Sequence, residues 1–437
     1  MKKIILFILL FASVLFGQNK KLTLTESLEI GIKNSKDLKI SHSKIVSSEA
    51  QVTSATSQLL PQLGLTASYM HLSNIPPFQV SLPIFPQPIQ ISPVILDNYN
   101  LKLTLQQPLF TGFRLLSLRG AAKSNYTASK LDYNSETNEV AFKIQSAFWN
   151  YYKAAQNDKV LSDNLQQINQ HLTDTKNFLA NGLATQNDVL KLEVQYSSTK
   201  LQKIEADNNL DIARTVFNQA VGLPLESKTE IETNEIITQK NSDNLNELIA
   251  EAKNNRSELK ALSSRVEASL QGVRAAESSW FPSIYLIGDY YYSKPNQRII
   301  PAVNQFKDTW DVGVSLSWSL WNWGNNSAQT TIAEQNKIQT ETNLSKLNDA
   351  VEIEVYQNYL TFKRAYDKVN VAKLGVNQAE ENYRMIKDKY DTQVASSTDL
   401  IDAETALLQA KTNYNNSLVE YELAKVLLDK SVGKKIY

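Results

Sequence analysis

The side chains that most often carry chemistry are sparse in this chain of 437 residues. The three histidines, His42, His71 and His171, lie far apart in the sequence, and there is no cysteine. No glycine-rich phosphate loop, zinc-ligand spacing or nucleophile elbow occurs. Nothing meets the geometric roles that an active site needs, so we expect neither an enzyme nor a bound cofactor or metal.

Two carboxylates do lie close together. Asp399 and Asp402 are three residues apart in the first turn of the last expected helix, so their side chains share one face. A purely local interpretation is available, because acidic residues favour a first turn through the helix dipole and Thr398 or Asp399 can cap the helix. Asp188 and Lys191 stand 211 residues earlier (399 − 188) and could pair within their own helix.

This spacing of 211 residues belongs to a larger repeat. Residues 34–38 resemble residues 255–259 at an offset of 221 (255 − 34), and Val221-Gly222 resembles Val432-Gly433 at an offset of 211 (432 − 221). Solenoid repeats have periods of about 20–50 residues, so a domain-sized unit is duplicated here. A longer loop in the first copy, between about Ser73 and Tyr99, accounts for the difference of ten.

The repeat and the composition divide the chain. Residues 1–17 are expected to be a signal peptide, because Lys2 and Lys3 precede an apolar run, Ile4 to Phe16, that is too short to span a bilayer. Residues 18–221 and 245–437 form the two repeats, each with the order helix, strand, strand, long helix, helix, and residues 222–244 form an equatorial linker. The 45 basic and 45 acidic residues balance, which argues against a nucleic-acid partner.

Long helices dominate each copy. From Leu344 to Tyr390 the apolar positions follow spacings of three and four, the heptad pattern of a coiled coil. No proline interrupts Leu115 to Ala180 or Asn325 to Tyr390, and each of these helices would be roughly 100 Å long at about 1.5 Å per residue. Shorter helices, about Leu245 to Trp280 and Asp399 to Val432 in the second copy, are expected in line beside the long one, which would make four rods per chain.

The strands alternate between apolar and small or polar residues. Leu101, Leu103 and Leu105 alternate with polar residues, and positions 312–320 follow the same pattern. An alternation of apolar and polar residues over about ten positions indicates a strand with one apolar face and one face in contact with water. A tilted strand of about 9–11 residues is long enough to cross a bilayer. Barrels begin at about eight strands and lipid tolerates no open edge. Four strands per chain therefore predict a homo-oligomer, without its order.

Tryptophans flank the strands of the second copy, before its first strand and at both ends of its second strand: Trp280, Trp310, Trp318, Trp321 and Trp323. Rings of Trp and Tyr mark the interfaces of membrane barrels, so we interpret these residues as a girdle that faces membrane lipid. The alternative is that they fill the core of a soluble sheet, which the small and polar residues of the opposite strand face disfavour.

In these features the chain resembles the TolC-like outer-membrane efflux proteins, the exit ducts of tripartite pumps and type I secretion systems. The resemblance covers Thr23 to Gly433 and includes two strand-to-helix segments, 107–112 and 319–324, and two helical turns, 181–188 and 393–399. It implies a mainly α-helical fold with a transmembrane β-barrel. Three protomers would form a twelve-stranded barrel in the outer membrane, continued by a periplasmic tunnel of twelve helical rods.

The resemblance also implies partners and sites. An inner-membrane transporter would supply the energy, and a periplasmic adaptor would dock on the two turns, at Gly182, Leu183, Ala184, Thr185, Val394, Ala395 and Ser396. The periplasmic gate would comprise an acidic ring and a closing tyrosine, formed by Asp399, Asp402, Asp188, Lys191 and Tyr390. Each has a structural alternative, since Gly182 can be a helix C-cap and Tyr390 continues the heptad pattern.

Two functions remain open from the sequence. The first is a passive exit duct, and the second is a soluble periplasmic or surface coiled-coil scaffold without a pore. Some family members hold the gate with an arginine in the second turn, but Ala395, Ser396 and Ser397 occupy that region here. The sequence does not identify the exported substrate.

Overall fold

The computed structural model describes residues 21–81, 83–239 and 244–437, so the expected signal peptide at 1–17 lies outside the described residues. The described chain forms two compact units. The helical unit comprises residues 21–42, 131–259 and 346–437, and the sheet unit comprises Ser43–Lys130 and Lys260–Ser345. Both copies of the repeat contribute to each unit.

The two copies follow the same order of elements. The first copy contains α1 (Leu24–Asn34), α2 (Lys36–Ser57), β2 (Gln62–His71), β5 (Asp97–Thr111), α3 (Arg114–Ala180) and α4 (Gln186–Val221). The second contains α5 (Leu245–Asn255), α6 (Ser257–Glu277), the short 3-10 helix η1 (Ser278–Trp280), β7 (Ser283–Lys294), β8 (Lys307–Ser317), α7 (Asn325–Asp391) and α8 (Ser397–Ser431). Two-residue strands pair elsewhere: β1 (Lys21–Leu22) with β6 (Glu230–Ile231), and β3 (Gln79–Val80) with β4 (Ile89–Gln90).

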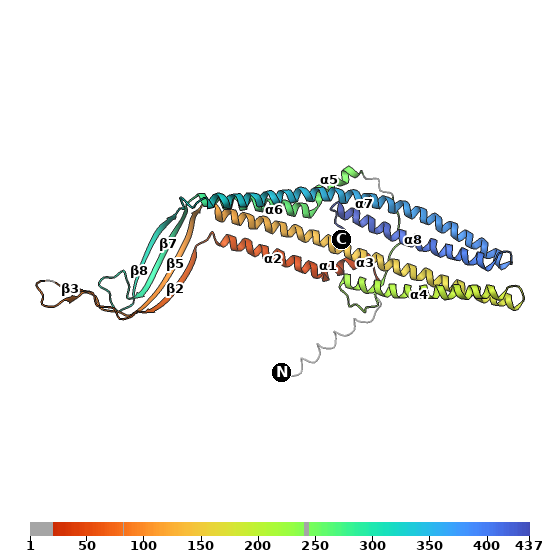
Figure 1. Cartoon of the computed structure of the whole chain (residues 1–437), viewed down its shortest axis with the longest axis horizontal. Helices are drawn as coiled ribbons and strands as arrows, with labels where there is room; N and C mark the ends of the chain where they lie inside the picture. Colours follow the sequence, from red (N-terminus) through yellow and green to blue (C-terminus); the bar gives the residue numbers. More distant parts are fainter. Residues whose placement is uncertain (1–20, 82, 240–243) are drawn as a thin grey trace, which may run out of the picture. The chain divides into compact units, whose positions relative to one another are not determined.

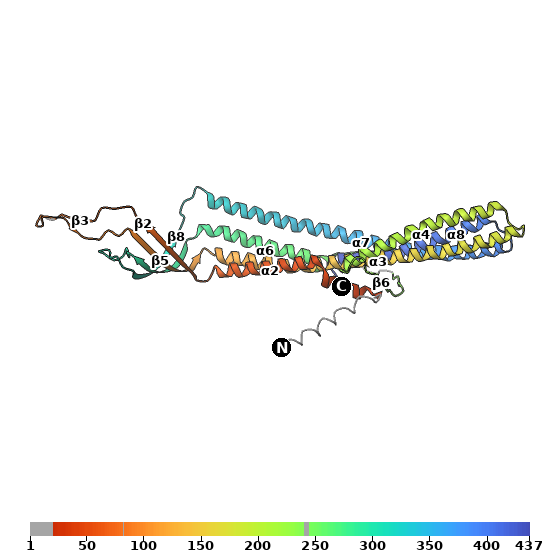
Figure 2. The same ribbon diagram turned by 90° about the horizontal axis from the view of Figure 1, so that it is seen from below.

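The prediction of two long unbroken helices is confirmed, since α3 and α7 have 67 residues each. In the helical unit, α3 pairs with α4 and α7 pairs with α8 as two hairpins, each closed by a short turn (Figure 1 and Figure 2). Six of the predicted heptad positions of α7 are buried, and the others are half-buried; the buried ones are Val351, Val355, Phe362, Ala365, Val369 and Tyr390. Within the described residues, no helix has both the length and the apolar character needed to cross a membrane.

The expectation of one continuous helix from Leu245 to Trp280 is wrong. Arg256 has an extended backbone (φ −61°, ψ 122°) and separates α5 from α6, as Ser35 (φ −61°, ψ 123°) separates α1 from α2. At the second break, a Cβ on Gly433 would lie 2.9 Å from Arg256 N. We attribute the break to this close packing with the end of α8, a tertiary cause that helix propensity does not record.

The sheet unit contains a four-stranded antiparallel sheet with the strand order β2-β5-β7-β8, besides the two-residue pair of β3 and β4 (Figure 1). The predicted alternation is confirmed, because Leu63 pairs with Leu105 and Leu65 pairs with Leu103 on one face. The strand predicted through Leu320 is shorter than expected. It ends at Ser317, which pairs with Ser283, the first residue of β7, so the residues beyond it have no partner strand in the described sheet.

Candidate functional site

The turns of the two helical hairpins are built alike. α4 begins with a capping box in which Thr185 N and its hydroxyl donate to Asp188 Oδ2 over 3.0 and 2.6 Å. α8 begins in the same way, with Ser396 N and its hydroxyl donating to Asp399 Oδ2 over 2.9 and 2.7 Å. These hydrogen bonds stabilise the charged carboxylates and hold the pKa of Asp188 and of Asp399 below its ordinary value.

Asp399 lies in the first turn of its own helix, as the local interpretation expects, but the N-cap is Ser396 instead of Thr398 or Asp399, and the carboxylate of Asp399 completes the capping box. Asp402 makes no such bond in the described capping box and lies exposed one turn later. Leu183 and Val394, one in each turn, are 59% and 76% exposed, so the turns present apolar side chains to the solvent. Gly182 is the left-handed residue that ends α3 (φ 78°), as its alternative role as a C-cap predicts.

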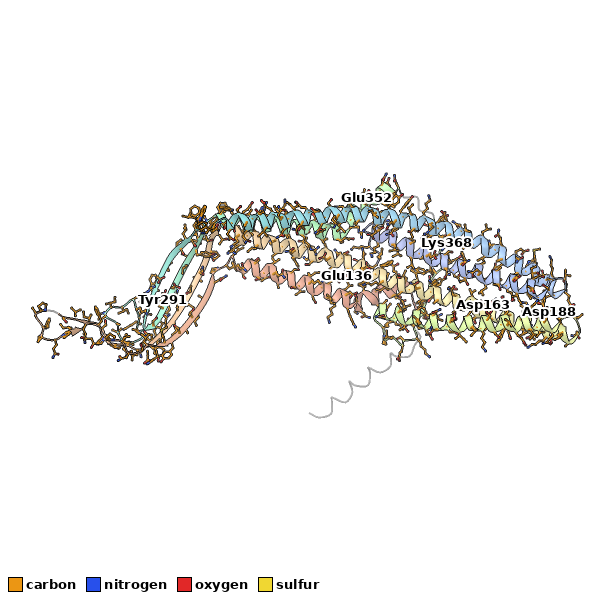
Figure 3. All side chains as sticks on the ribbon, in the orientation of Figure 1. Glu136, Asp163, Asp188, Tyr291, Glu352 and Lys368 are labelled. Carbon is orange, nitrogen blue, oxygen red and sulfur yellow. The ribbon has the colours of Figure 1, made fainter. Side chains whose placement is uncertain are left out.

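Hydrogen bonds join the two turns to each other. Ser397 Oγ donates to Asp188 Oδ1 over 2.7 Å, and Lys191 Nζ donates to Thr398 Oγ1 over 2.9 Å. Figure 3 shows Asp188 near the tip of the hairpin, at the start of α4. Lys191 thus points to α8 instead of pairing within its own helix, and the first turn of each helix binds the first turn of the other.

Tyr390 also connects the hairpins. Its side chain is 7% exposed, its hydroxyl lies 2.5 Å from Thr175 Oγ1 of α3, and its ring packs edge-on against Phe178. Burial raises the pKa of this tyrosine, so the hydroxyl stays protonated near neutral pH. Tyr390 therefore both continues the heptad pattern of α7 and contacts the other hairpin.

Sequence reasoning missed a third connection, deeper between the hairpins. His171 of α3 lies against Tyr383 of α7 and Glu404 of α8, and all three side chains come from different helices. A signal for such pairs was present. Far from the turns the bonded residues are more widely separated, as Asn157 and Asn416 are at 259, but near the turns four hydrogen bonds between the hairpins join residues 207, 209, 212 and 215 apart. These separations lie close to the repeat offset of 211, so corresponding segments of the two copies face each other.

The sheet unit carries aromatic residues toward both ends of its apolar face. At one end, Trp318 Nε1 donates to Trp280 O over 3.2 Å, and Trp321 and Trp323 pack edge-on with ring centroids 5.9 Å apart. At the other end the aromatic side chains are Tyr69, Tyr99, Tyr292 and Phe306, whose rings contact one another.

Trp310 does not open its strand as expected. β8 begins three residues earlier, at Lys307, and Trp310 pairs with Tyr290 inside the sheet. The strand starts earlier because Lys307 to Thr309 still find partners along β7, from Ser293 to Tyr291. Trp310 therefore lies toward the end that holds Tyr292, away from the other four tryptophans of the predicted girdle.

The opposite face of the sheet is polar and internally paired. Lys102 Nζ lies 2.9 Å from Asp289 Oδ2, and the Thr104 hydroxyl donates to Asp289 Oδ1 over 2.6 Å. Tyr291, labelled on the sheet in Figure 3, donates to Asp289 Oδ2 over 3.2 Å. Arg298 pairs with Asp311. Over residues 21–81, 83–239 and 244–437, no cluster of three or more His, Asp or Glu side chains could hold a metal ion.

Comparison with known proteins agrees with this architecture. The profile of the outer membrane efflux protein family matches residues 29–223 and 248–434. The chain is 22% identical over 390 residues to outer membrane protein TolC of Vibrio cholerae, covering 87% of this chain and 84% of TolC. It is also 22% identical over 404 residues to the proteases secretion protein PrtF of Dickeya chrysanthemi, covering 90% of this chain and 84% of PrtF.

Among solved structures, the outer membrane protein VceC of Vibrio cholerae is similar, with a TM-score of 0.77 and 18% identity. The alignment covers 95% of this chain and 97% of VceC, so the likeness extends over the whole fold. The family profile matches both copies of the repeat, including the two hairpin turns and the four strands of the sheet. The chain belongs to the outer membrane efflux protein family.

Proposed function

We propose that this protein is a subunit of an outer-membrane exit duct that passively conducts cargo from the periplasmic side to the exterior. Three copies would each supply a four-stranded sheet to one twelve-stranded barrel, and their helices would continue the duct through the periplasm. The observation that carries the proposal is the sheet, whose one face is apolar and exposed while the other holds ion pairs.

The edges of the sheet support an oligomer. β2 and β8 have no further neighbour in the described sheet, and an open edge in lipid would leave backbone groups without hydrogen-bond partners. Pairing of β8 of one copy with β2 of the next would satisfy both edges, and repetition around an axis would close the barrel. The number of three copies comes from the resemblance to the family.

The apolar face also has a suitable height. On β5, Tyr99 and Phe110 lie near its two ends, and both pair with β7. Their separation along the strand is about 36 Å at about 3.3 Å per residue. A strand tilt of about 40° reduces the height of this segment along the barrel axis to about 28 Å, which is close to the apolar band of about 25 Å in known barrels. We therefore propose that the aromatic clusters, with Trp280, Trp318, Trp321 and Trp323 at one end, lie at the membrane interfaces.

The helical unit leaves apolar side chains that its own core does not use. On α4 they recur along one face at Leu190, Val194, Leu201, Ile204, Ile212 and Val216, and on α7 at Ile353, Tyr356, Leu360, Val371, Leu374 and Met385. All are 47% exposed or more. Two different faces on one chain suit a head-to-tail interface, in which α4 of one copy packs against α7 of the next around a ring.

We further propose that the hairpin turns form the periplasmic end of the duct. Symmetry would gather Asp402 from each copy around the axis, where exposed carboxylates favour cations over anions. Asp399 and Asp188 would contribute charge while capping their helices, and Lys191 would reduce the negative potential from its place beside Thr398. The exposed Leu183 and Val394 would give the periplasmic adaptor its apolar contacts, and cargo choice would lie with the inner-membrane transporter.

The soluble scaffold is the weaker alternative. It would leave the apolar face of the sheet in water, including Leu65, Val312 and Val314 at 65% exposure or more. Soluble proteins rarely expose apolar patches of more than a few hundred Å². A duct buries this face in lipid, and membership of an outer-membrane family favours the same conclusion.

Conductance in planar bilayers tests the proposal. The full-length protein, purified from the outer membrane in detergent, should form cation-preferring channels, and cross-linking should give a trimer. Asp402→Asn should reduce the cation preference more than Asp399→Asn does, because Asp399 is already held by Ser396. A stable, folded monomer recovered in water without detergent would contradict the duct, and equal effects of the two substitutions would contradict the role of Asp402.

A further inference from the structure

A buried polar contact lies between the two helical hairpins, one helical turn from the contact of Tyr390 with Thr175, whose hydroxyl donates to His171 O over 2.7 Å. His171 Nε2 lies 3.1 Å from Glu404 Oε1 and 3.1 Å from the Tyr383 hydroxyl. The side chains of His171 and Glu404 are only 3% and 1% exposed. The contact therefore buries a carboxyl group and an imidazole, away from water, at the interface between the two hairpins.

The carboxyl group of Glu404 has few partners in this position. Among the described residues, neither of its oxygens accepts a well-directed hydrogen bond, and His171 Nδ1 has no partner either. On the same face of α8, Leu400, Ala403 and Leu407 are buried. Burial and the charge of Glu404 raise the pKa of Tyr383 to about 12, so its hydroxyl keeps its proton.

Replacing both partners of such a contact and removing only one of them have different effects on stability. Taking a charged group out of water is costly, and a buried pair often stabilises a protein less than apolar side chains of similar volume. Removing only one partner is worse, because the other charge then stays buried without compensation. Separation of the hairpins would return both groups to water, so this contact favours the joined arrangement less than an apolar contact would.

We propose that the contact of His171 with Glu404 determines how easily the two hairpins separate. Glu404 acts as a positioning residue, because its buried carboxylate lowers the stability of the joined hairpins relative to the separated ones. The proposal rests on the proposed function, in which the turns of both hairpins form the periplasmic end, and it adds that separation of α3 and α4 from α7 and α8 opens this end. The hydrogen bonds from Ser397 and Lys191 and the contact of Tyr390 with Thr175 then hold the tips together, while the buried carboxyl group limits the stability of the joined state.

The first copy supplies a matched control. Glu193 stands 211 residues before Glu404 (404 − 193), but it pairs with Lys176 of its own hairpin over 2.9 Å, and both side chains are half exposed. The pair does not cross between hairpins. Glu193→Gln should therefore leave the opening of the duct unchanged, although it makes the same chemical change as Glu404→Gln.

The test compares the open fraction of single channels formed by the full-length protein in planar bilayers. His171→Leu leaves the carboxylate without its partner and should raise the open fraction about tenfold or more. Glu404→Gln removes the buried charge at constant volume and should leave the open fraction at or below that of the unaltered protein. The double variant His171→Leu/Glu404→Leu should also be at or below that value.

The outcomes separate the alternatives. An unchanged open fraction in His171→Leu, or opening by Glu404→Gln as large as that by His171→Leu, would overturn the proposal, because an ordinary latch weakens when either partner is lost. If His171→Leu fails to assemble, His171→Gln, whose amide can still donate to the carboxylate, should assemble and gate normally, and increased opening would count against the proposal. Absence of channels from the unaltered protein would instead contradict the proposed function itself.

Discussion

The two hairpin turns share their backbone design and differ in the side chains that surround it. Both helices that follow the turns begin with a capping box, on Thr185 and on Ser396. The residue that ends the preceding helix in the left-handed conformation is Gly182 in the first copy and Gln393 in the second (φ 78° and 63°). Duplication has preserved the turn geometry even where the residue type no longer favours it.

Larger differences lie where the hairpins face each other. At equivalent positions, 211 residues apart, Leu192 corresponds to Ala403, and the half-exposed Glu193 corresponds to the buried Glu404. Residues that determine the backbone, such as caps, are thus retained, whereas residues that contact the other copy have diverged. A duplicated chain can use one fold twice and still build an asymmetric contact between the copies.

The largest expected effect comes from exchanging a core residue between copies. Leu192 is fully buried and packs with Leu172 and Val189, so Leu192→Ala should lower the free energy of unfolding by about 3 kcal/mol per subunit through lost burial and a cavity. Denaturant unfolding followed by far-ultraviolet circular dichroism measures this change. The reverse exchange, Ala403→Leu, should cost about 1–3 kcal/mol by overpacking. Tolerance of both exchanges would show that the two positions are interchangeable.

The next largest expected effect is the loss of stability on substituting the glycine that ends the last helix of each copy, and it should be similar in both copies. Gly222 and Gly433 end α4 and α8 with φ of 77° and 83°, and a Cβ on them would lie 2.7 Å from Asn34 Cβ and 2.9 Å from Arg256 N, respectively. Gly222→Ala and Gly433→Ala should each cost about 2 kcal/mol, from backbone strain and from the clash. Thermal unfolding in detergent measures both. A neutral result at Gly433 would remove our explanation for the helix break at Arg256.

Local patterns in the sequence predicted much of this fold. The heptad positions of α7 and the alternation of β5 depend on neighbours within a few residues, and both agree with the structure. The acidic first turn of α8 also agrees, although its N-cap is Ser396 instead of Thr398 or Asp399. The breaks at Ser35 and Arg256 could not be predicted in that way, because each is a place where another helix end packs closely.

The candidate site was predicted only in part for the same reason. The place of Asp399 in the first turn of its helix follows from the sequence, but the capping role of Asp188 was not predicted. Thr175, Ser397 and Thr398 become partners only when the hairpins meet. The burial of Glu404 was not foreseen, because glutamate is rarely buried in a folded protein and its counterpart Glu193 stays half exposed. The repeat offset was the usable clue, since it pairs corresponding segments across the interface between hairpins.

A smaller effect should appear at the residues that end α3 and α7. Gln393 adopts a left-handed backbone that costs a side chain with a Cβ roughly 1 kcal/mol, so Gln393→Gly should stabilise the second turn by up to about 1 kcal/mol. Gly182→Gln should destabilise the first turn by a similar amount, because nothing lies within 4 Å of its Cβ position and only the backbone conformation opposes the change. Equal and opposite shifts in the unfolding midpoint would confirm that the turns share one geometry.

The smallest effect is the response of the two turns to acid. The hydrogen bonds that lower the pKa of Asp188 and Asp399 stabilise the turns only while the carboxylates are charged. This stability is fully present above the ordinary carboxyl value of about pH 3.9 and is lost as the pH falls further, through the lowered pKa of each group. Hydrogen exchange of peptides covering 181–190 and 392–401, measured by mass spectrometry down to about pH 3, follows the loss at each turn.

The first turn should resist acid slightly better than the second. Asp188 accepts a further hydrogen bond from Ser397, whereas the pKa of Asp399 is lowered by Ser396 alone. Ser397→Ala removes that extra donor and should bring the acid response of the first turn close to that of the second. Exchange of the first turn at neutral pH should rise slightly in the same variant, because the lost bond stabilises the turn whenever Asp188 is charged. If the first turn opens at higher pH than the second in the unaltered protein, the bond from Ser397 does not bias the ionisation of Asp188, and the two caps differ for another reason.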